Sequence, residues 1–505
     1  MTDGDKVSFA GVFRHSPGRL VAIFAGVQMV LWAGLATWFA DVVPYDTAEG
    51  FVWGRSLQWG YHKHPPLQAW ILGVSERLFP GAFWLAFVYG QLCIGIATWA
   101  VWQLARSIVG DQQGALAALA LAGVHTFTLP NATFTPDQLS IPIWALLCLH
   151  FWRAVGEGRP LYWYALAIDV ALVVYSKYVG LLLVLVLAML TLATSHGWAT
   201  LRSPHPWISA LLALLLASPH LLFLAEDPAP LLSYPLDREQ AGSSAEHIEF
   251  VSRFIGAQVL NHLGLALLAS FLFLRTNGGG GLVVPRTEPP PFSKPFVYTV
   301  ALAPVTITVL LNVWSGVNFR HAWTLPMFCL SPLAVILLAG DKLRIARPHL
   351  AAMLLILLAI GQPIASFAVR TVQVHLGRYD QMTYPARELA HTVTAAFRER
   401  TGLPLRTIVG RRTDGGLAAL YSPDRPLVFL DADPRQSPWI DPAALTAGGF
   451  VVIWPLPPSG TELESRAEAL VRGLPRTQTL RLKAGKHVFD VAYTVVPPTV
   501  AGRSD

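Results

Sequence analysis

Apolar runs of membrane-spanning length recur along most of the first 370 residues, and they constrain the fold more than any other feature. A helix needs about 20 apolar residues to cross a bilayer, with a range of roughly 17–25. On this criterion we place about eleven spans, at residues 20–40, 82–107, 113–130, 138–153, 160–175, 178–195, 206–224, 251–274, 296–314, 321–340 and 348–369. The sequence therefore predicts an α-helical polytopic membrane protein.

The composition agrees with this class of protein. Of the 505 residues, 53% are hydrophobic and 13% are charged, whereas roughly 25% are charged in a soluble domain. The net charge of +6 does not indicate a nucleic-acid partner, because the basic residues fall mostly between the apolar runs. Cys93, Cys148 and Cys329 all lie within apolar runs, which argues against both a disulfide framework and a CxxC metal site.

Lysine and arginine in the short loops predict the topology, because cytoplasmic loops carry an excess of both. They are concentrated in alternate loops, which we place on the cytoplasmic side. The long first loop, residues 42–81, then faces outward. The same holds for residues 131–137, 176–178, 226–250 and 315–320 and for the C-terminal tail.

The character of the sequence changes near residue 371. One amphipathic helical pattern is followed by several short apolar runs that are typical of strands. We therefore expect a transmembrane domain at residues 1–370 and a small extracytoplasmic α/β domain at residues 371–505. The glycines of the 410–416 segment match no phosphate-binding loop, and residues 278–295 are predicted to be a flexible cytoplasmic linker.

The outward loops contain the ionisable residues that could carry chemistry. Asp46 and Glu49 are three residues apart, so they share one face if this stretch is helical. A carboxylate beside a low-dielectric region can serve as a general base toward a hydroxyl group. An ordinary interfacial carboxylate or a helix cap is the alternative for both residues.

His62, Lys63 and His64 form a compact cationic patch in the same loop. Pro65 and Pro66 fix the backbone that follows the patch, so these side chains are held in place. The patch could bind a phosphate group or be an interfacial basic cluster. A metal site is less favoured, because an HxH pair lacks helical spacing and a clear third ligand.

The later outward loops add further candidates. Asp137 begins a predicted span and is either a helix-start residue or part of a site. Lys177 lies in a short turn and could bind an anionic headgroup, since a charge at the bilayer centre costs ~2.5–3.5 kcal/mol. Arg320 and His321 are two more potential anion contacts, or members of an interfacial basic and aromatic belt.

Several of these motifs together resemble those of polytopic glycosyltransferases related to the protein O-mannosyltransferases. Bacterial members of this group include the lipid A aminoarabinose and galacturonic acid transferases. The resemblance covers residues 20–340, and it rests on Asp46 with the Gly60-Tyr61 and His64-Pro65-Pro66-Leu67 motifs, on Thr135-Pro136-Asp137, on Ser176-Lys177-Tyr178-Val179-Gly180, and on Arg320-His321-Ala322-Trp323 with Pro326.

The resemblance implies a GT-C fold and a polyprenyl-phosphate-linked sugar as donor. It implies that Asp46 is the catalytic carboxylate, that Asp137 is a second acidic residue near the acceptor or a bound cation, and that His64 lies near the donor phosphate. Lys177 is a weaker candidate for that phosphate contact. It also implies a multi-pass protein of the inner membrane whose site faces the periplasm, and an envelope glycolipid or protein as acceptor.

Two departures from the family pattern affect individual residues. Thr47 stands where many relatives have an acidic residue, which leaves the role of Glu49 undecided. Lys63 stands where relatives often have an acidic or neutral residue, which weakens a metal site there. No cofactor is implied with certainty, and a divalent cation stays open.

Other functions fit a polytopic chain as well. A transporter or flippase for a lipid-linked sugar would also have many spans, although transporters favour sites at the bilayer midplane and internal repeats. The candidate charges here gather on one side, and no repeat is visible. An O-antigen ligase or polymerase would share the lipid-linked donor, and a scaffold that displays the C-terminal domain would leave the 62–66 patch unexplained.

Overall fold

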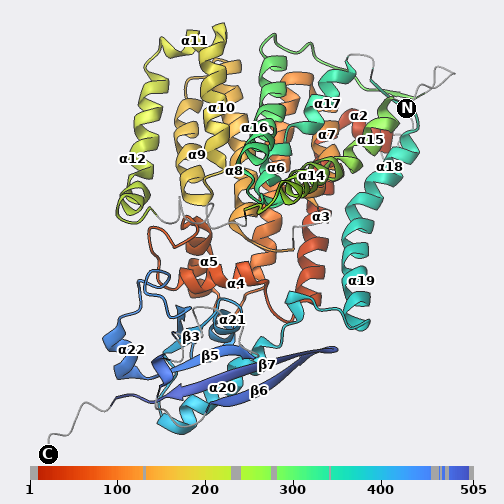
Figure 1. Ribbon diagram of the computed structural model, residues 1–505. Helices are drawn as coiled ribbons and strands as arrows, with labels where there is room; N and C mark the ends of the chain where they lie inside the picture. The colour runs from red at the N-terminus through yellow and green to blue at the C-terminus, as the bar shows by residue number, and fades with distance from the viewer. Residues whose placement is uncertain are drawn as a thin grey trace, which may run out of the picture. The chain divides into compact units, whose positions relative to one another are not determined.

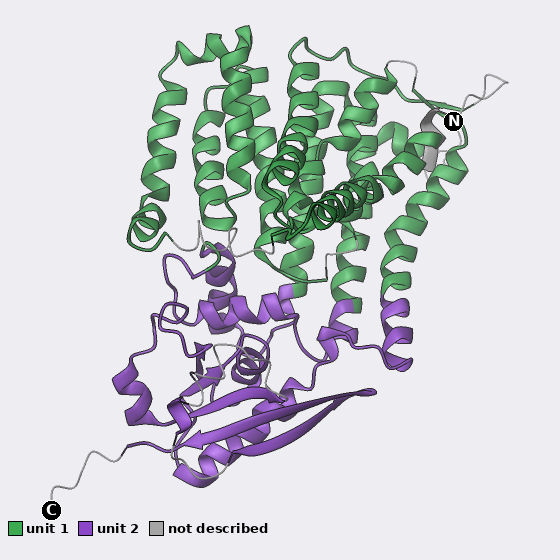
Figure 2. Cartoon of the chain, viewed as in Figure 1, with its two compact units in different colours: residues 1–35, 63–65, 87–366 green, residues 36–62, 66–86, 367–505 purple. Residues whose placement is uncertain are grey.

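The structure is a computed structural model that describes residues 9–128, 132–228, 240–273, 281–340, 343–456, 466, 469–472 and 477–499. The chain divides into two compact units (Figure 2). The helical unit comprises residues 1–35, 63–65 and 87–366, and the α/β unit comprises residues 36–62, 66–86 and 367–505. The predicted division at residue 370 is simpler than this one and remains a prediction.

Long apolar helices make up most of the helical unit and confirm a multi-pass membrane protein (Figure 1). In the described ranges, seven helical segments are long and apolar enough to cross a bilayer. They are α3 (Pro17–Phe39), α6 (Leu85–Val109), α8 (Pro136–Phe151) with the π turn η4 (Trp152–Gly156), α12 (His205–Glu226), α14 (Ser244–Asn261) with α15 (Leu263–Phe273), α16 (Ser293–Ser315), and α18 (Pro348–Ile356) with the π turn η6 (Leu357–Gly361) and α19 (Gln362–His375).

Two bent helix pairs raise this number to nine if each pair counts as one span. In the first, α10 (Gly180–Ala193) and α11 (Ser195–Leu201) meet at 95°, and in the second, the 3-10 helix η5 (His321–Phe328) and α17 (Ser331–Ala339) meet at 47°. A shorter apolar helix, α9 (Tyr162–Ser176), completes this set. The short α2 (Phe9–His15) precedes α3.

The span predicted at residues 113–130 is not one continuous helix. It begins as α7 (Asp111–Ala120) and continues as two short 3-10 turns, η1 (Leu121–Gly123) and η2 (His125–Phe127). Gly123 packs against the start of α15, where an added Cβ would lie 2.8 Å from the backbone of Gly264. The apolar pattern predicts burial of this run, but it carries no signal for such a close backbone approach.

Where the structure describes the predicted flexible linker at 278–295, it contains one short strand and the first residues of α16, and several residues between them are exposed. β1 (Leu282–Val283) pairs antiparallel with β2 (Arg344–Ile345). The Gln113 side chain donates a hydrogen bond to the Val284 carbonyl at 3.3 Å. Residues 278–280 of the linker and residues 229–239 of the predicted outward loop lie outside the described residues.

A five-stranded mixed sheet forms the centre of the α/β unit (Figure 1). The strand order is β4-β3-β5-β7-β6, in which β4, β3 and β5 are parallel and β7 and β6 continue antiparallel. The described elements of the unit, besides the ends of α3 and α19 and the start of α6, are α4 (Tyr45–Gly54), α5 (Leu67–Leu78), η7 (Gln381–Thr383), α20 (Ala386–Thr401), β3 (Thr407–Gly410), α21 (Asp414–Tyr421), β4 (Leu427–Leu430), α22 (Pro442–Gly448), β5 (Phe450–Leu456), β6 (Gln478–Ala484) and β7 (His487–Val496). This sheet confirms the predicted C-terminal α/β fold.

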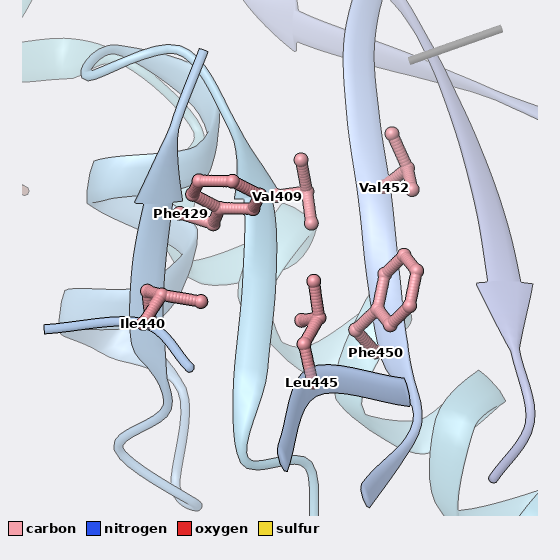
Figure 3. Packing of buried hydrophobic residues seen from close by; sticks show 6 residues of the cluster. All are labelled: Val409, Phe429, Ile440, Leu445, Phe450 and Val452. Carbon is pink, nitrogen blue, oxygen red and sulfur yellow. The ribbon is translucent and has the colours of Figure 1, made fainter. Parts of the chain in front are cut away.

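Alternating strand residues build the core on one face of this sheet (Figure 3). Val409 of β3, Phe429 of β4 and Val452 of β5 point into one buried cluster, which Leu445 of α22 joins. All four residues of β3 are buried, so the strand is covered on both faces. Central strands that are covered in this way consist largely of consecutive apolar residues, as Ile408 and Val409 of β3 illustrate.

The two helices of the first loop pack into the same unit as this sheet. α4 and α5 cross so closely that a Cβ on Gly73 would lie 2.2 Å from the Gly54 carbonyl oxygen. Arg55 pairs with Glu76 at 2.7 Å and donates to the carbonyl of Pro426 at 2.8 Å. The loop and the C-terminal sheet therefore share one core, although some 300 residues separate them in the sequence.

Candidate active site

The two carboxylates of the first loop lie on one face of α4, as their spacing predicts. Asp46 is in the first turn of the helix, where a negative charge interacts favourably with the helix dipole. Its side chain is 52% exposed, whereas that of Glu49 is 3% exposed. Only Asp46 is therefore placed to meet a substrate from solution.

Both carboxylates face Arg412 of the C-terminal sheet region. The guanidinium Nη1 lies 2.7 Å from Oδ1 of Asp46 and 3.7 Å from Oε2 of Glu49. No residue of the described part of the chain donates a hydrogen bond to the second carboxylate oxygen of Asp46. That oxygen is available to accept a proton.

A tight strand-to-helix turn positions Arg412. β3 ends at Gly410 and α21 begins at Asp414, and a Cβ on Gly415 would lie 2.9 Å from the Gly410 backbone. The preceding Arg411 donates to the Asp414 carboxylate at 2.6 and 3.0 Å. Tyr384 donates to the other oxygen of Asp414 at 2.9 Å. These contacts fix the turn from which Arg412 projects.

Three tyrosines hold the start of α4. The hydroxyl groups of Tyr45 and Tyr379 are hydrogen-bonded, and the rings of Tyr45 and Tyr384 meet edge to face at 6.3 Å. Burial raises the pKa of all three tyrosines, and for Tyr384 the charge of Asp414 adds to this effect. They therefore stay neutral near physiological pH and fix the residue next to Asp46.

The cationic patch of the first loop is partly buried at all three positions. The His62 ring packs edge-on against Trp53, with ring centroids 5.5 Å apart. His62 belongs to the α/β unit, while Lys63 and His64 belong to the helical unit. Their predicted role in phosphate binding stays a prediction.

In the helical unit, Asp137 and Lys177 form an ion pair between the start of α8 and the end of α9. Thr135 caps α8 by accepting a hydrogen bond from the Gln138 amide, so Asp137 itself is not the cap. The side chains of Asp137 and Lys177 are 24% and 10% exposed. Two residues that are 40 positions apart in the sequence are thus brought together, and each offsets the charge of the other.

Arg320 and His321 lie on the surface of the helical unit, where the extended segment after α16 enters η5. η5 packs against α8 and against η2. The side chain of Thr324 donates a hydrogen bond to the His321 carbonyl at 2.7 Å, which fixes the first turn of η5. Both side chains are exposed, and their predicted contact with an anion stays a prediction.

Among the described residues, no three His, Cys, Asp or Glu side chains are grouped so that they could hold a metal ion. Asp46 and Glu49 of the α/β unit face Arg412, and Asp137 of the helical unit pairs with Lys177.

Arg412 is the residue of this site that the sequence interpretation missed. Its signal was the Arg-Arg pair directly after an apolar strand pattern, at the carboxyl end of a strand that is parallel to both its neighbours. Open α/β sheets place ligand-binding residues at such ends, where the strand order reverses. The glycine pattern of this segment alone gave no reason to single it out.

Comparisons with known proteins agree with this architecture. Residues 63–223 match the family model described as dolichyl-phosphate-mannose-protein mannosyltransferase. No curated protein matches the chain in sequence.

Among solved structures, ArnT from Cupriavidus metallidurans bound to undecaprenyl phosphate has a TM-score of 0.62 and 14% identity, over 94% of this chain and 98% of that one. The apo form of the same ArnT has a TM-score of 0.60 with the same identity and coverage. The Archaeoglobus fulgidus oligosaccharyltransferase has a TM-score of 0.47 and 13% identity, over 92% of this chain and 69% of that one. The chain therefore has a GT-C fold over most of its length, and residues 63–223 match the mannosyltransferase family model.

Proposed function

We propose that the chain is a membrane glycosyltransferase that moves a sugar from a polyprenyl-phosphate donor to a hydroxyl or phosphate group of an envelope glycolipid or protein. The proposed site faces the periplasmic side of the inner membrane. The GT-C fold and the family match support the reaction class. The undecaprenyl phosphate in the ArnT structure supports a lipid-linked donor. The observation that carries the proposal is the half-exposed Asp46 carboxylate with one oxygen available for a proton.

In the proposed reaction, a hydroxyl group of the acceptor attacks the anomeric carbon of the donor sugar. Asp46 accepts the hydroxyl proton as the new carbon–oxygen bond forms. The bond between the anomeric carbon and the phosphate oxygen breaks, and its electron pair leaves with the lipid phosphate. The result is inversion at the anomeric carbon in a single displacement.

The charge that develops on the leaving phosphate needs fixed cations. His64 is our first candidate for this contact, with His62, Lys63 and Lys177 as further candidates and Arg320 and His321 as anion contacts. Asp137 is proposed to act near the acceptor, with its carboxylate oriented by Lys177. Glu49 is too deeply buried to act as a second base.

Sugar transfer by the purified protein in proteoliposomes tests the proposal. The probe is a radiolabelled polyprenyl-phosphate sugar, supplied with envelope lipids as acceptors. Asp46→Asn should lower the transfer rate by roughly 10²–10⁴-fold, which is the usual contribution of a general base. The thermal unfolding midpoint should stay close to that of the wild type, because Asp46 is half exposed.

Asp490→Asn is the matched control, since Asp490 is a partly exposed carboxylate of the same unit that pairs with an arginine at 2.9 Å. It should leave the transfer rate unchanged. A wild-type rate in Asp46→Asn removes Asp46 as the base. Movement of the labelled lipid across the bilayer without sugar transfer would identify a transporter instead.

A further inference from the structure

We infer that Arg412 is a positioning residue for the Asp46 carboxylate, and that the buried Glu49 holds Arg412 from the other side. The inference rests on the proposed role of Asp46 as the base. It assigns a function in the reaction to the C-terminal part of the chain, because Arg412 lies 366 residues after Asp46.

The geometry of the three side chains supports this role. The Arg412 guanidinium donates to Oδ1 of Asp46 at 2.7 Å, which fixes the orientation of the carboxylate. A guanidinium has a planar, rigid set of donors, so it restricts a carboxylate more than a lysine would. The opposite oxygen of Asp46 is left to receive the proton.

Glu49 explains why Arg412 stays in place. With 3% of its side chain exposed, Glu49 is a buried carboxylate that needs a compensating charge. Arg412 is 3.7 Å away and supplies it. Two carboxylates one helical turn apart would otherwise repel each other, and a shared cation removes much of this cost.

The same charges argue against a direct contact of Arg412 with the donor phosphate. When both carboxylates are ionised, the three side chains together carry one negative charge. A phosphate bound to Arg412 would come close to two carboxylates that already lie within 3.7 Å of the same guanidinium nitrogen, and like charges at such distances repel. Arg412 is therefore assigned to the base and not to the leaving group.

Steady-state kinetics of Arg412→Gln in proteoliposomes tests the inference. A misplaced base should lower kcat roughly 10–100-fold, because small errors in geometry have costs of this size. The KM for the polyprenyl-phosphate sugar should stay within about twofold of the wild type, because Arg412 does not touch the donor. Arg412→Lys should retain a higher kcat than Arg412→Gln, since it keeps the charge but loses the rigid fork.

Two further measurements separate positioning from a merely structural role. Guanidinium ion added to Arg412→Ala should restore part of kcat, whereas urea at the same concentration should not. In an Asp46→Glu background, Arg412→Gln should have a smaller effect than in the wild type, since both act through one carboxylate. Arg481→Gln is the control, because it removes an exposed arginine–aspartate pair of the same unit and should leave kcat unchanged.

The outcomes are distinct. A wild-type kcat in Arg412→Gln, or a raised donor KM with unchanged kcat, overturns the positioning role. If Arg412→Gln does not fold, Arg412→Lys decides instead. A wild-type kcat in Arg412→Lys would then overturn the positioning role. If the wild-type protein transfers no sugar, the proposed function itself is ruled out.

Discussion

At the scale of single residues, the ion pair of Asp137 and Lys177 has two separable consequences. The pair is mostly buried, so it should contribute to stability, and Asp137 is also proposed to act near the acceptor. Removing one partner of a buried pair leaves an uncompensated charge, which is usually more harmful than removing both partners.

We therefore expect Asp137→Asn and Lys177→Met each to lower the unfolding midpoint in detergent, and the double variant to recover part of the loss. The coupling energy should fall at roughly 1–3 kcal/mol, since the pair is only partly exposed. The exposed pair of Arg253 and Glu249 is the control and should show a coupling below about 1 kcal/mol.

The sugar-transfer rates of these variants then separate the structural role of Asp137 from its proposed role near the acceptor. If its carboxylate acts near the acceptor, the double variant should recover stability without recovering sugar transfer. A double variant with near wild-type transfer would show that the pair serves the fold alone.

The candidate residues differ in how well the sequence predicted them. Asp46, Asp137 and Lys177 were visible, because charges beside apolar runs are costly enough to be noticed. The partner of Asp46 was not visible, because Arg412 lies 366 residues away and no local pattern connects the two.

At the scale of secondary structure elements, the crossing of α4 and α5 is highly sensitive to substitution. The helices touch at Gly54 and Gly73, where the backbones are in contact. The sequence shows two glycines in a polar and aromatic loop, and neither the helices nor their crossing follows from the apolar pattern.

Gly73→Ala should destabilise the α/β unit by roughly 1–3 kcal/mol, because the added methyl group forces the helices apart. Thermal unfolding and sugar transfer should both fall. Gly26→Ala is the matched control, because Gly26 is also in a helix and an added Cβ there meets no atom within 4 Å. An unchanged midpoint in Gly73→Ala would show that the crossing relaxes without cost.

At the scale of the whole molecule, periodicity predicted the helical and α/β parts, but it gave no sign that the first loop packs with the C-terminal sheet. Spans and strands are local patterns of about 5 to 20 residues, and they were read correctly in most places. The packing of the first loop with the C-terminal sheet depends on contacts such as that of Arg55 with the carbonyl of Pro426. Such contacts leave no periodic signal.

This packing predicts the result of a truncation. A chain that ends at residue 370 lacks α21 and β4, against which Arg55 is anchored. We expect a protease to cleave the truncated protein within residues 45–78 under conditions in which the full chain resists cleavage there. Equal protection of this loop in both proteins would show that α4 and α5 hold their structure without the sheet.

The anchoring of Arg55 also sets an order of events during biosynthesis. Arg55 and Pro426 are 371 residues apart, so at roughly 5–20 residues per second the ribosome needs roughly 20–75 s to deliver the second after the first. Throughout that interval α4 and α5, which follow the first span, have been made but lack their final partners. The nascent protein must therefore keep an unfinished loop intact while the intervening membrane helices are inserted, until the segment around Pro426 is made.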